Sequence, residues 1–271
     1  MSKTANIRQL YKPIQPTVKQ SGENVTYVEF LPDGKLQDFI YCYWQLRTTK
    51  PLAEPFNYNV VADGCIDIFF ECNNPDDSYV MGFCKKFTEF PLDNEFNYIG
   101  VRFLPTMFPQ QYKVNAKALS NKAEPLNKIA PTTANFITNN FNGATITDEI
   151  QSLFDAYFLQ LIANTSFNDD HRLYKAIEII LEKFGVIDIE NDLKTGISSR
   201  QLRRLFEYYI GDSAKVFSKV VRFQNVLNAK PSTQSLRQNK LFFDVGYYDQ
   251  AHFIKEFKNF YGVTPSRAFG R

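Results

Sequence analysis

The sequence predicts an α+β protein, with a β-rich N-terminal sandwich or small barrel followed by an all-α C-terminal domain. Short runs of aromatic and β-branched residues recur between positions 25 and 103 and are separated by turn residues, which is typical of strands. From about Val114 the apolar residues recur at helical spacing instead. We place the first domain at residues 1–165 and the second at residues 171–271, on either side of the polar stretch Asn164–Asp170.

The β-rich part is predicted from five apolar runs and the turns between them. Pro32-Asp33-Gly34, Ala62-Asp63-Gly64 and Asn73-Asn74-Pro75-Asp76 combine residues that favour tight turns. Short strands at such spacing favour a sandwich or a small barrel. The predicted strands are Val25–Leu31, Ile40–Leu46, Ile66–Phe70, Tyr79–Phe83 and Tyr98–Phe103.

A long helix is predicted after Thr145-Ile146-Thr147-Asp148, which resembles a capping box. An apolar stripe at helical spacing follows it and comprises Ile150, Leu153, Phe154, Tyr157, Phe158 and Leu161. This stripe either belongs to the core of the domain or forms a dimerisation surface. On the second interpretation we predict a homodimer through the helical region between Val114 and Ala163.

The composition excludes several classes of function. There is no C-x-x-C pair and there are only two histidines, so we expect no metal site, no cofactor and no enzyme. No apolar run is long enough for a membrane span, and residues 1–20 do not resemble a signal peptide. We therefore expect a soluble cytoplasmic protein with no membrane partner. The cysteines, which we expect to be buried thiols, are Cys42, Cys65, Cys72 and Cys84.

Charge is distributed unevenly along the chain. Residues 171–271 hold 17 Lys and Arg residues against 10 Asp and Glu residues, whereas residues 1–170 hold 14 against 19. A basic C-terminal part suits a polyanionic partner, although a solvated basic surface is an equally good interpretation of charge alone.

The C-terminal third contains an internal repeat. Leu202-x3-Phe206-x4-Gly211-x-Ser213 recurs 51 residues later as Phe253-x3-Phe257-x4-Gly262-x-Thr264. An apolar pair at i, i+4 marks the buried face of a helix, and a glycine after it suits a left-handed cap. Ser198 and Asp249 stand where they would cap the two repeated helices. The pattern predicts two helix-turn-helix units, although a duplicated helical bundle would give the same repeat.

The outward positions of the two repeated helices are polar and basic. Arginine and lysine side chains read guanine edges or neutralise phosphates, and glutamine reads adenine. Two such helices about one DNA turn apart suit successive major grooves. The candidate DNA-binding residues are Ser198, Arg200, Gln201, Arg203 and Arg204 in the first helix, and Gln250, His252, Lys255 and Lys258 in the second.

These motifs resemble the DNA-binding domain of AraC/XylS-type regulators. The resemblance rests on Ser198-Ser-Arg-Gln-Leu-Arg-Arg-Leu-Phe206 and on Gly246-Tyr-Tyr-Asp-Gln-Ala-His-Phe-Ile-Lys-Glu-Phe257 with Gly262-Val-Thr-Pro-Ser266, and it covers residues 171–270. It implies two helix-turn-helix subdomains joined by a linking helix, which the sequence places at Ala214–Ala229. It also implies double-stranded DNA as the partner, with RNA polymerase as a further candidate.

The chain departs from the family in the first helix of each unit. The family has an apolar residue followed by a small one, where this chain has Asn191-Asp192 and Leu241-Phe242. We expect either a shifted helix register or an altered docking on DNA. In a shifted register, Ile189 and Leu193 would face the core in the first unit, and Leu236 or Leu241 would do so in the second.

The N-terminal half more weakly resembles a β-rich sensor domain attached to some of these regulators. The matching segments begin at Leu36, Ala62 and Gly100. The resemblance implies a small-molecule effector, for which the candidate residues are Trp44, Arg47, Asp67 and Arg102. In the alternative that we favour, Trp44 is a core residue and Arg102 pairs with an acid. Asp63 and Asp67 also have the spacing of a carboxylate pair, but the Asp63-Gly64 dipeptide is better explained as a turn.

The sequence thus predicts a sequence-specific DNA-binding transcriptional regulator with an N-terminal effector-binding or dimerisation domain. The alternative is a ligand-binding or protein-interaction module whose helix-turn-helix units no longer bind DNA.

Overall fold

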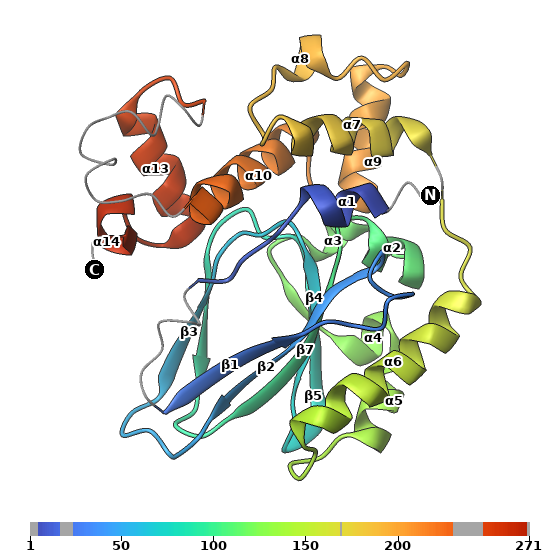
Figure 1. Ribbon diagram of the computed structural model, residues 1–271, viewed down its shortest axis with the longest axis vertical. Helices are drawn as coiled ribbons and strands as arrows, with labels where there is room; N and C mark the ends of the chain where they lie inside the picture. The colour runs from blue at the N-terminus through green and yellow to red at the C-terminus, as the bar shows by residue number, and fades with distance from the viewer. Residues whose placement is uncertain (1–4, 17–23, 169, 230–245, 270–271) are drawn as a thin grey trace.

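A computed structural model describes residues 5–16, 24–168, 170–229 and 246–269. Its centre is a six-stranded antiparallel sheet in the order β1-β2-β7-β4-β5-β8, and β3 and β6 form a separate two-stranded sheet (Figure 1). The strands are β1 (Val25–Phe30), β2 (Ile40–Thr48), β3 (Phe56–Val60), β4 (Ile66–Glu71), β5 (Asn74–Met81), β6 (Thr88–Leu92), β7 (Asn97–Phe103) and β8 (Ala123–Pro125).

Helices make up the rest of the described architecture, and among residues 171–229 and 246–269 they are the only regular elements. Among the described residues, none of the helices combines the length and apolarity that a membrane crossing requires. The helices are α1 (Ala5–Leu10), α2 (Met107–Tyr112), α3 (Ala116–Leu119), α4 (Leu126–Ile129), α5 (Pro131–Asn140), α6 (Thr147–Ala163), α7 (His171–Glu182), α8 (Ile189–Asp192), α9 (Ser199–Tyr209), α10 (Ala214–Ala229), α13 (Gln250–Tyr261) and α14 (Pro265–Phe269).

The two faces of the six-stranded sheet bury different side chains. Strand β4 shows why, since successive residues of a strand point to opposite faces. Ile66, Ile68 and Phe70 are buried on one face, whereas Asp67 and Phe69 point to the other and are half-buried. The first face is covered by helices α5 and α6, and the second faces the β3–β6 sheet (Figure 1).

The packing of helix α6 shows whether its apolar stripe belongs to the core or to a dimer surface. Ile150, Phe154 and Phe158 are fully buried, and the ring of Phe154 lies 5.0 Å from that of Tyr43 on β2. The other members of the stripe are half-buried against the same core. The stripe is therefore domain core, and it no longer motivates the homodimer that we predicted from it.

Several local predictions in the β-rich part need correction. The sequence analysis missed β3 and β6. The turn of the β4–β5 hairpin lies at Cys72 and Asn73, earlier than predicted, because Asn74 already pairs with Glu71.

Helix α6 is capped one residue later than predicted. The backbone N–H of Ile146 donates to Glu149, while the Thr145 hydroxyl accepts from Asn142 and closes the preceding turn. The four cysteines are all buried and free, as predicted.

Helix α10 holds the C-terminal part together. It runs between α9 and α13 (Figure 1), with the ring of Phe217 6.1 Å from that of Phe206 on α9 and the ring of Phe223 5.4 Å from that of Phe257 on α13. This is the linking helix that the resemblance implied. In the first unit Leu193 is buried and Ile189 half-buried, so these two residues face the core while Asp192 pairs with Lys183. Leu236, Leu241 and Phe242 lie outside the described residues.

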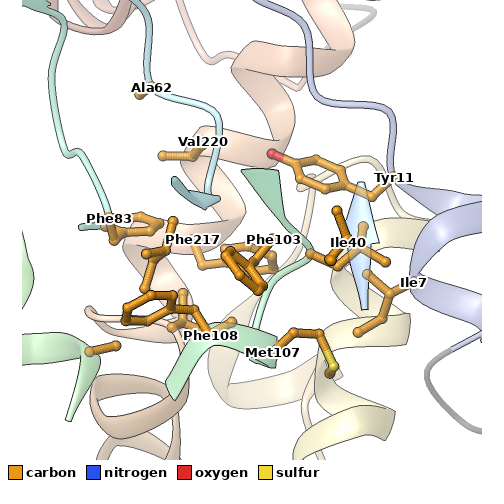
Figure 2. Close-up of a cluster of buried hydrophobic side chains, with 14 of the residues drawn as sticks. Ile7, Tyr11, Ile40, Ala62, Phe83, Phe103, Met107, Phe108, Phe217 and Val220 are labelled. Carbon is orange, nitrogen blue, oxygen red and sulfur yellow. The ribbon is translucent and has the colours of Figure 1, made fainter. Parts of the chain in front are cut away.

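The β-rich and helical parts share one hydrophobic core. Phe217 of α10 packs beside Tyr11 and Phe83, which come from the N-terminal segment and the β-rich part (Figure 2). Gly64 permits this approach, because its φ is +74° and a Cβ there would lie 3.2 Å from both Phe217 and the Tyr11 hydroxyl. The linking helix is therefore buried against the β-rich part and does not act as a free spacer.

We expect Phe217→Ala to destabilise the whole chain rather than the helical part alone. Removing a fully buried phenylalanine costs about 3–5 kcal/mol, and this side chain belongs to both parts. Urea unfolding followed by circular dichroism and by Trp44 fluorescence should show one transition with a lowered midpoint. Lys215→Ala on the exposed face of the same helix is the control, and a loss confined to the far-UV signal would contradict the shared core.

Candidate functional site

Helix α9 is fixed at both ends by residues that the sequence singled out. The Ser198 hydroxyl accepts from the backbone N–H of Gln201, and the Gln201 side chain accepts from the backbone N–H of Ser198, which is a capping box. Gly211, with φ +112°, follows the end of the helix and donates to Phe206. Of the predicted contacts, Ser198 and Gln201 are therefore engaged in holding the helix start.

The remaining predicted residues of α9 differ in their availability. Leu202 and Phe206 are buried, which turns Arg200 and Arg204 to solvent, where neither makes an ion pair with a described residue. Arg203 is also exposed, but its Nε lies 2.9 Å from the Glu207 carboxylate. The free positive charge of this helix is therefore concentrated at Arg200 and Arg204.

Helix α13 repeats the arrangement. Asp249 caps it by accepting from the backbone N–H of His252 at 2.7 Å, and Gly262 ends it with φ +94°. Phe253 and Phe257 are buried, and the structure exposes the predicted residues Gln250, His252, Lys255 and Lys258. The sequence analysis missed Tyr248, which is 90% exposed directly before the cap. The sequence contained one indication of this exposed tyrosine, which is its position directly before the start of a repeated helix.

A buried carboxylate attaches α13 to α10. Glu256 lies 2.7 Å from Lys219 and 3.0 Å from Arg222, and the exposed ring of His252 is 3.8 Å away. Burial raises the pKa of Glu256, but hydrogen bonding to Lys219 and the charge of Arg222 outweigh it and hold the pKa below its usual value. Arg222 also donates to Gly246 and lies over the ring of Tyr247, so the same cluster fixes the segment that enters α13.

The C-terminal ends of both helices are fastened to the β-rich part. At the end of α9, Lys117 of α3 pairs with Glu207 at 2.8 Å, and the Ser120 hydroxyl donates to the carbonyl of Gly211. At the end of α13, the Asn259 carbonyl accepts from Phe87 and the Asn259 side chain donates to Lys85. The N-terminal halves, which carry all of the exposed predicted residues except Lys258, make no such contacts among the residues described.

A cavity of about 260 Å³ lies between the six-stranded sheet and the β3–β6 sheet. The ring of Trp44 on β2 packs against Gly100 of β7, where a Cβ would lie 2.2 Å from it. The sequence-predicted residues Trp44, Asp67 and Arg102 all line this cavity. The aromatic residues that line it with Trp44 are Tyr58, Phe69, Tyr79, Phe90 and Tyr98, which the sequence analysis missed.

Arg47 lies elsewhere. Residues 43, 45 and 47 of β2 point to the face opposite Trp44, and Arg47 is exposed at the end of the strand beside Glu95 and Asn97. It is therefore not part of the cavity. Its three-residue separation from Trp44 places it on the other face of an extended strand, which the period of two would have revealed.

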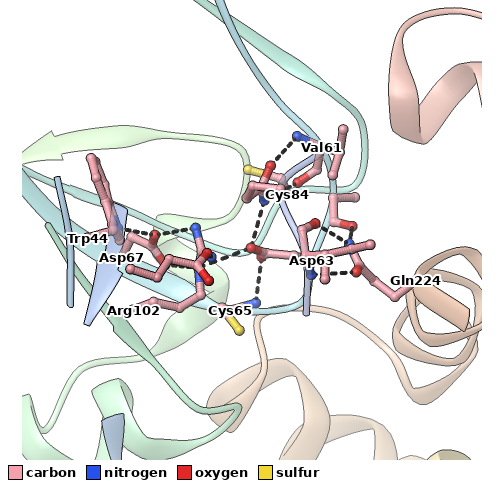
Figure 3. A network of polar contacts seen from close by, with 12 residues as sticks. Trp44, Val61, Asp63, Cys65, Asp67, Cys84, Arg102 and Gln224 are labelled. Atoms are coloured by element: carbon pink, nitrogen blue, oxygen red, sulfur yellow. Dashed lines mark hydrogen bonds and ion pairs between the residues drawn. The ribbon is translucent and has the colours of Figure 1, made fainter. Parts of the chain in front are cut away.

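Arg102 is the buried charge at the end of the cavity. Only 1% of it is exposed, and its Nε and Nη2 donate to both carboxylate oxygens of Asp67 at 3.2 and 3.0 Å. Its Nε also lies 3.3 Å from Asp63, and Trp44 donates to Asp67 at 3.0 Å (Figure 3). The alternative that we favoured required a buried Trp44 and an Arg102 paired with an acid. The structure contains both, and it contains the cavity as well.

The loop that carries Asp63 joins this cluster to the linking helix. The Gln15 side chain donates to Asp63 and to the Val61 carbonyl and accepts from the Val61 backbone N–H. Gln224 of α10 donates to the Ala62 carbonyl at 2.8 Å (Figure 3). Asp63 therefore serves a turn and an ion pair, and a path of direct contacts runs from the cavity to the helix between the two units.

The pKa of Asp67 gives a test of this cluster. Burial raises the pKa of Asp67 to about 6, against the opposing charge of Arg102. An acid with a raised folded-state pKa contributes stability that is fully present below its unfolded pKa and is lost as pH rises through the folded value. We therefore expect this contribution to fall between about pH 4 and pH 6, and Trp44 emission to titrate with a midpoint near 6.

The matched variant is Asp67→Asn, which keeps a hydrogen-bond acceptor for Trp44 but has no titrating proton. Trp44 is the only tryptophan of the chain, so its emission reports on this site alone. An unchanged titration in Asp67→Asn would assign the midpoint to another group.

Comparison with known proteins gives two family matches and one similar curated protein. Residues 193–271 match a family described as a helix-turn-helix domain, and residues 28–125 match a family described as a domain of unknown function. An uncharacterized HTH-type transcriptional regulator from Haemophilus influenzae is 42% identical over 65 residues. That match covers 24% of this chain and 21% of the relative. The chain thus spans about a fifth of the length of the curated relative it matches.

Solved structures of ToxT from Vibrio cholerae are similar over most of the chain. Apo ToxT is 12% identical, with a TM-score of 0.43 over 83% of this chain and 97% of that one. ToxT bound to (E)-4-(8-methylnaphthalen-1-yl)but-3-enoic acid is also 12% identical, with a TM-score of 0.42 over 92% of this chain and 99% of that one.

Three observations fall on the same C-terminal residues, namely the repeated motif, the two capped helices and the family match. Residues 193–271 are therefore an AraC-type helix-turn-helix domain.

Proposed function

We propose that this chain is a sequence-specific DNA-binding transcriptional regulator whose N-terminal part binds a small-molecule effector in the cavity. One observation carries the DNA-binding half of this proposal. Two helices with the same sequence motif each bury an apolar face, and each exposes basic side chains near the end that is not fastened to the β-rich part. That is the arrangement a pair of major-groove reading helices requires.

Within this proposal the exposed residues have different tasks. Arg200 and Arg204 of α9, and Gln250 and Lys255 of α13, are the candidates for base edges, because they are exposed within the N-terminal half of each helix. A helix N-terminus also attracts a backbone phosphate, so the start of α9, where the cap Ser198 is uncharged, would lie close to the DNA backbone. Lys258 would meet phosphate.

The effector-binding half rests on the cavity and on the contacts around it. Effector sites are concave and mostly apolar, with a few polar groups, which describes the space between the two sheets. The loop 61–65 both borders this space and bonds to α10, so a ligand that displaces the loop would act on the helix between the reading units.

We extend the proposal to an activator that works with RNA polymerase in the cytoplasm, for which the AraC-type domain is the support. The homodimer is not carried over, because the stripe that suggested it covers the sheet of its own chain.

We expect Arg200→Ala and Lys255→Ala to weaken duplex binding without lowering the thermal midpoint. Both side chains are exposed, and a lost base contact costs about 1–3 kcal/mol while relaxing one position of the site. The measurement is fluorescence anisotropy at two salt concentrations on an operator selected from random duplexes, beside a thermal melt. Lys128→Ala, an exposed lysine of the β-rich part, is the charge-matched control.

Leu202→Ala separates reading from folding in the same assay. Leu202 is 5% exposed, so its truncation should destabilise the first unit by about 2–5 kcal/mol and lower the melting temperature. If both Arg200→Ala and Lys255→Ala bind as the unmodified protein does at both salts, the helices are not readers. The interaction-module alternative would then account for the fold better.

A further inference from the structure

The charge that faces the cavity is negative. Among the described residues, the carboxylates of Asp63, Asp67 and Asp77 line it against the single guanidinium of Arg102. The Arg102 side chain is only 1% exposed, whereas those of Asp63 and Asp67 are 11% and 16% exposed. The arginine is thus covered by its own partners, and the acids form the side of this ion cluster that a ligand can reach. A cavity with this charge concentrates cations.

The acids lie on both sides of an aromatic pair. Phe69 of β4 is directly opposite Tyr79 of β5, and Asp67 is opposite Met81. Because the strands are antiparallel, Asp77 lies beyond this pair on the side away from Asp67. Asp77 is exposed and accepts a hydrogen bond from the Tyr79 hydroxyl at 2.8 Å. A ligand against these two rings would therefore have a carboxylate on either side.

Rings from both sheets form one continuous wall of the cavity. Phe69 is at its centre, and the rings around it, with centroids at 5.7, 5.9 and 6.3 Å, are those of Tyr79, Phe90 and Tyr98. Trp44 lines the same space. Aromatic rings attract cations electrostatically, and the attraction is stronger where water is excluded. The rings and the carboxylates together therefore specify an organic cation.

The hydrogen bonds that the acids already make narrow the class further. Both oxygens of Asp67 accept from Arg102, and one of them also accepts from Trp44. Asp63 accepts from Gln15. A primary ammonium carries three N–H donors, which would leave water and find few free acceptors here. A quaternary ammonium has no N–H group and needs only ring surface and negative charge.

We propose that the cavity binds a quaternary ammonium ion attached to a small apolar body. This inference rests on the effector-binding half of the proposed function and names the chemical class of that effector. An apolar cavity of about 150 Å³ accommodates a benzene molecule, so about 260 Å³ suits a trimethylammonium group with one ring.

Trp44 makes the test direct, because the only tryptophan of the chain lines the cavity. The full chain is titrated at pH 7.5, where Asp67 with its pKa of about 6 is ionised, and emission is excited at 295 nm. Four small benzyl compounds serve as probes: benzyltrimethylammonium, benzylammonium, 2,2-dimethyl-1-phenylpropan-1-ol and phenylmethanesulfonate. The alcohol carries a tert-butyl group in place of the trimethylammonium group, and the sulfonate carries the opposite charge.

We expect a saturable change in Trp44 emission with benzyltrimethylammonium. Its affinity should be at least about tenfold higher than that of the neutral alcohol or the sulfonate, and higher than that of benzylammonium. The other three probes are also added to the complex with the quaternary ion, so that binding without a change in emission is detected as displacement.

One pair of variants tests the ring wall. Phe90→Leu keeps an apolar wall but removes a ring, and it should weaken binding of the quaternary ion at least about threefold while changing that of the alcohol less than about twofold. Phe56→Leu makes the same change in the same two-stranded sheet, at a position that does not line the cavity, and should leave both affinities unchanged.

A second pair tests the charge. Asp77→Asn removes one carboxylate at an exposed position and should weaken binding of the quaternary ion about threefold at low ionic strength, with the alcohol unaffected. Asp76→Asn is the control, because the Asp76 carboxylate accepts from Thr138 of α5 on the other face of β5.

Several outcomes would overturn the proposed class. They are equal or tighter binding of the alcohol, the sulfonate or the primary ammonium, no saturable response to the quaternary ion, and a response that either Phe90→Leu or Asp77→Asn leaves unchanged. An equal loss of alcohol binding in these variants would also overturn it, because the substitution would then act on the shape of the cavity alone.

The same measurements keep this inference apart from the proposed function. Tight binding of the alcohol or the sulfonate in place of the quaternary ion would overturn the class and leave the effector-binding half standing. Retained duplex binding together with a failed titration would leave the DNA-reading function intact. Loss of duplex binding in Arg200→Ala and Lys255→Ala is independent of the cavity, which those residues do not line.

Discussion

The burial of one positive charge organises much of this structure. Arg102 lies almost wholly inside the β-rich part, and a buried guanidinium is tolerated only where carboxylates neutralise it. Asp67 supplies one from the neighbouring strand, and Asp63 supplies another from a loop, which must therefore stay close to the sheet. The same loop binds Gln15 and Gln224. Neutralising the charge thus positions the cavity, the N-terminal segment and the linking helix together.

Much of the fold could be predicted because the strongest signals are local. The repeat with Leu202 and Phe206, the caps Ser198 and Asp249, and the left-handed Gly211 and Gly262 each act within one helix or its ends. Strands β3 and β6 were missed because they pair only with one another, and their sequences mix apolar residues with asparagine, glutamate and proline. The stripe of α6 had two valid interpretations from sequence, since only tertiary packing distinguishes a core from an interface.

The candidate sites were predictable to a different extent. The exposed basic residues of α9 and α13 followed from helical periodicity. The i, i+4 pair of Arg203 with Glu207 and the Ser198-x-x-Gln201 capping box are local patterns too, but the sequence analysis did not use them. Of the candidate effector residues, Trp44, Asp67 and Arg102 line the cavity, while strand alternation puts Arg47 on the opposite face of its strand. The contacts of residues 5–16 with α10 join positions about 210 apart in sequence, and no local pattern announces such a contact.

Fastening both helix ends to one shared core has a consequence for the spacing of an operator. The exposed ends of α9 and α13 are held at a fixed separation and rotation, because each helix is attached to the β-rich part as well as to α10. B-DNA turns once in about 10–10.5 base pairs, so one inserted base pair rotates the second half-site by about a tenth of a turn. A hinged pair of units would follow that rotation by bending its linker. This chain would instead have to distort the duplex, which makes the length of the central spacer part of what it recognises.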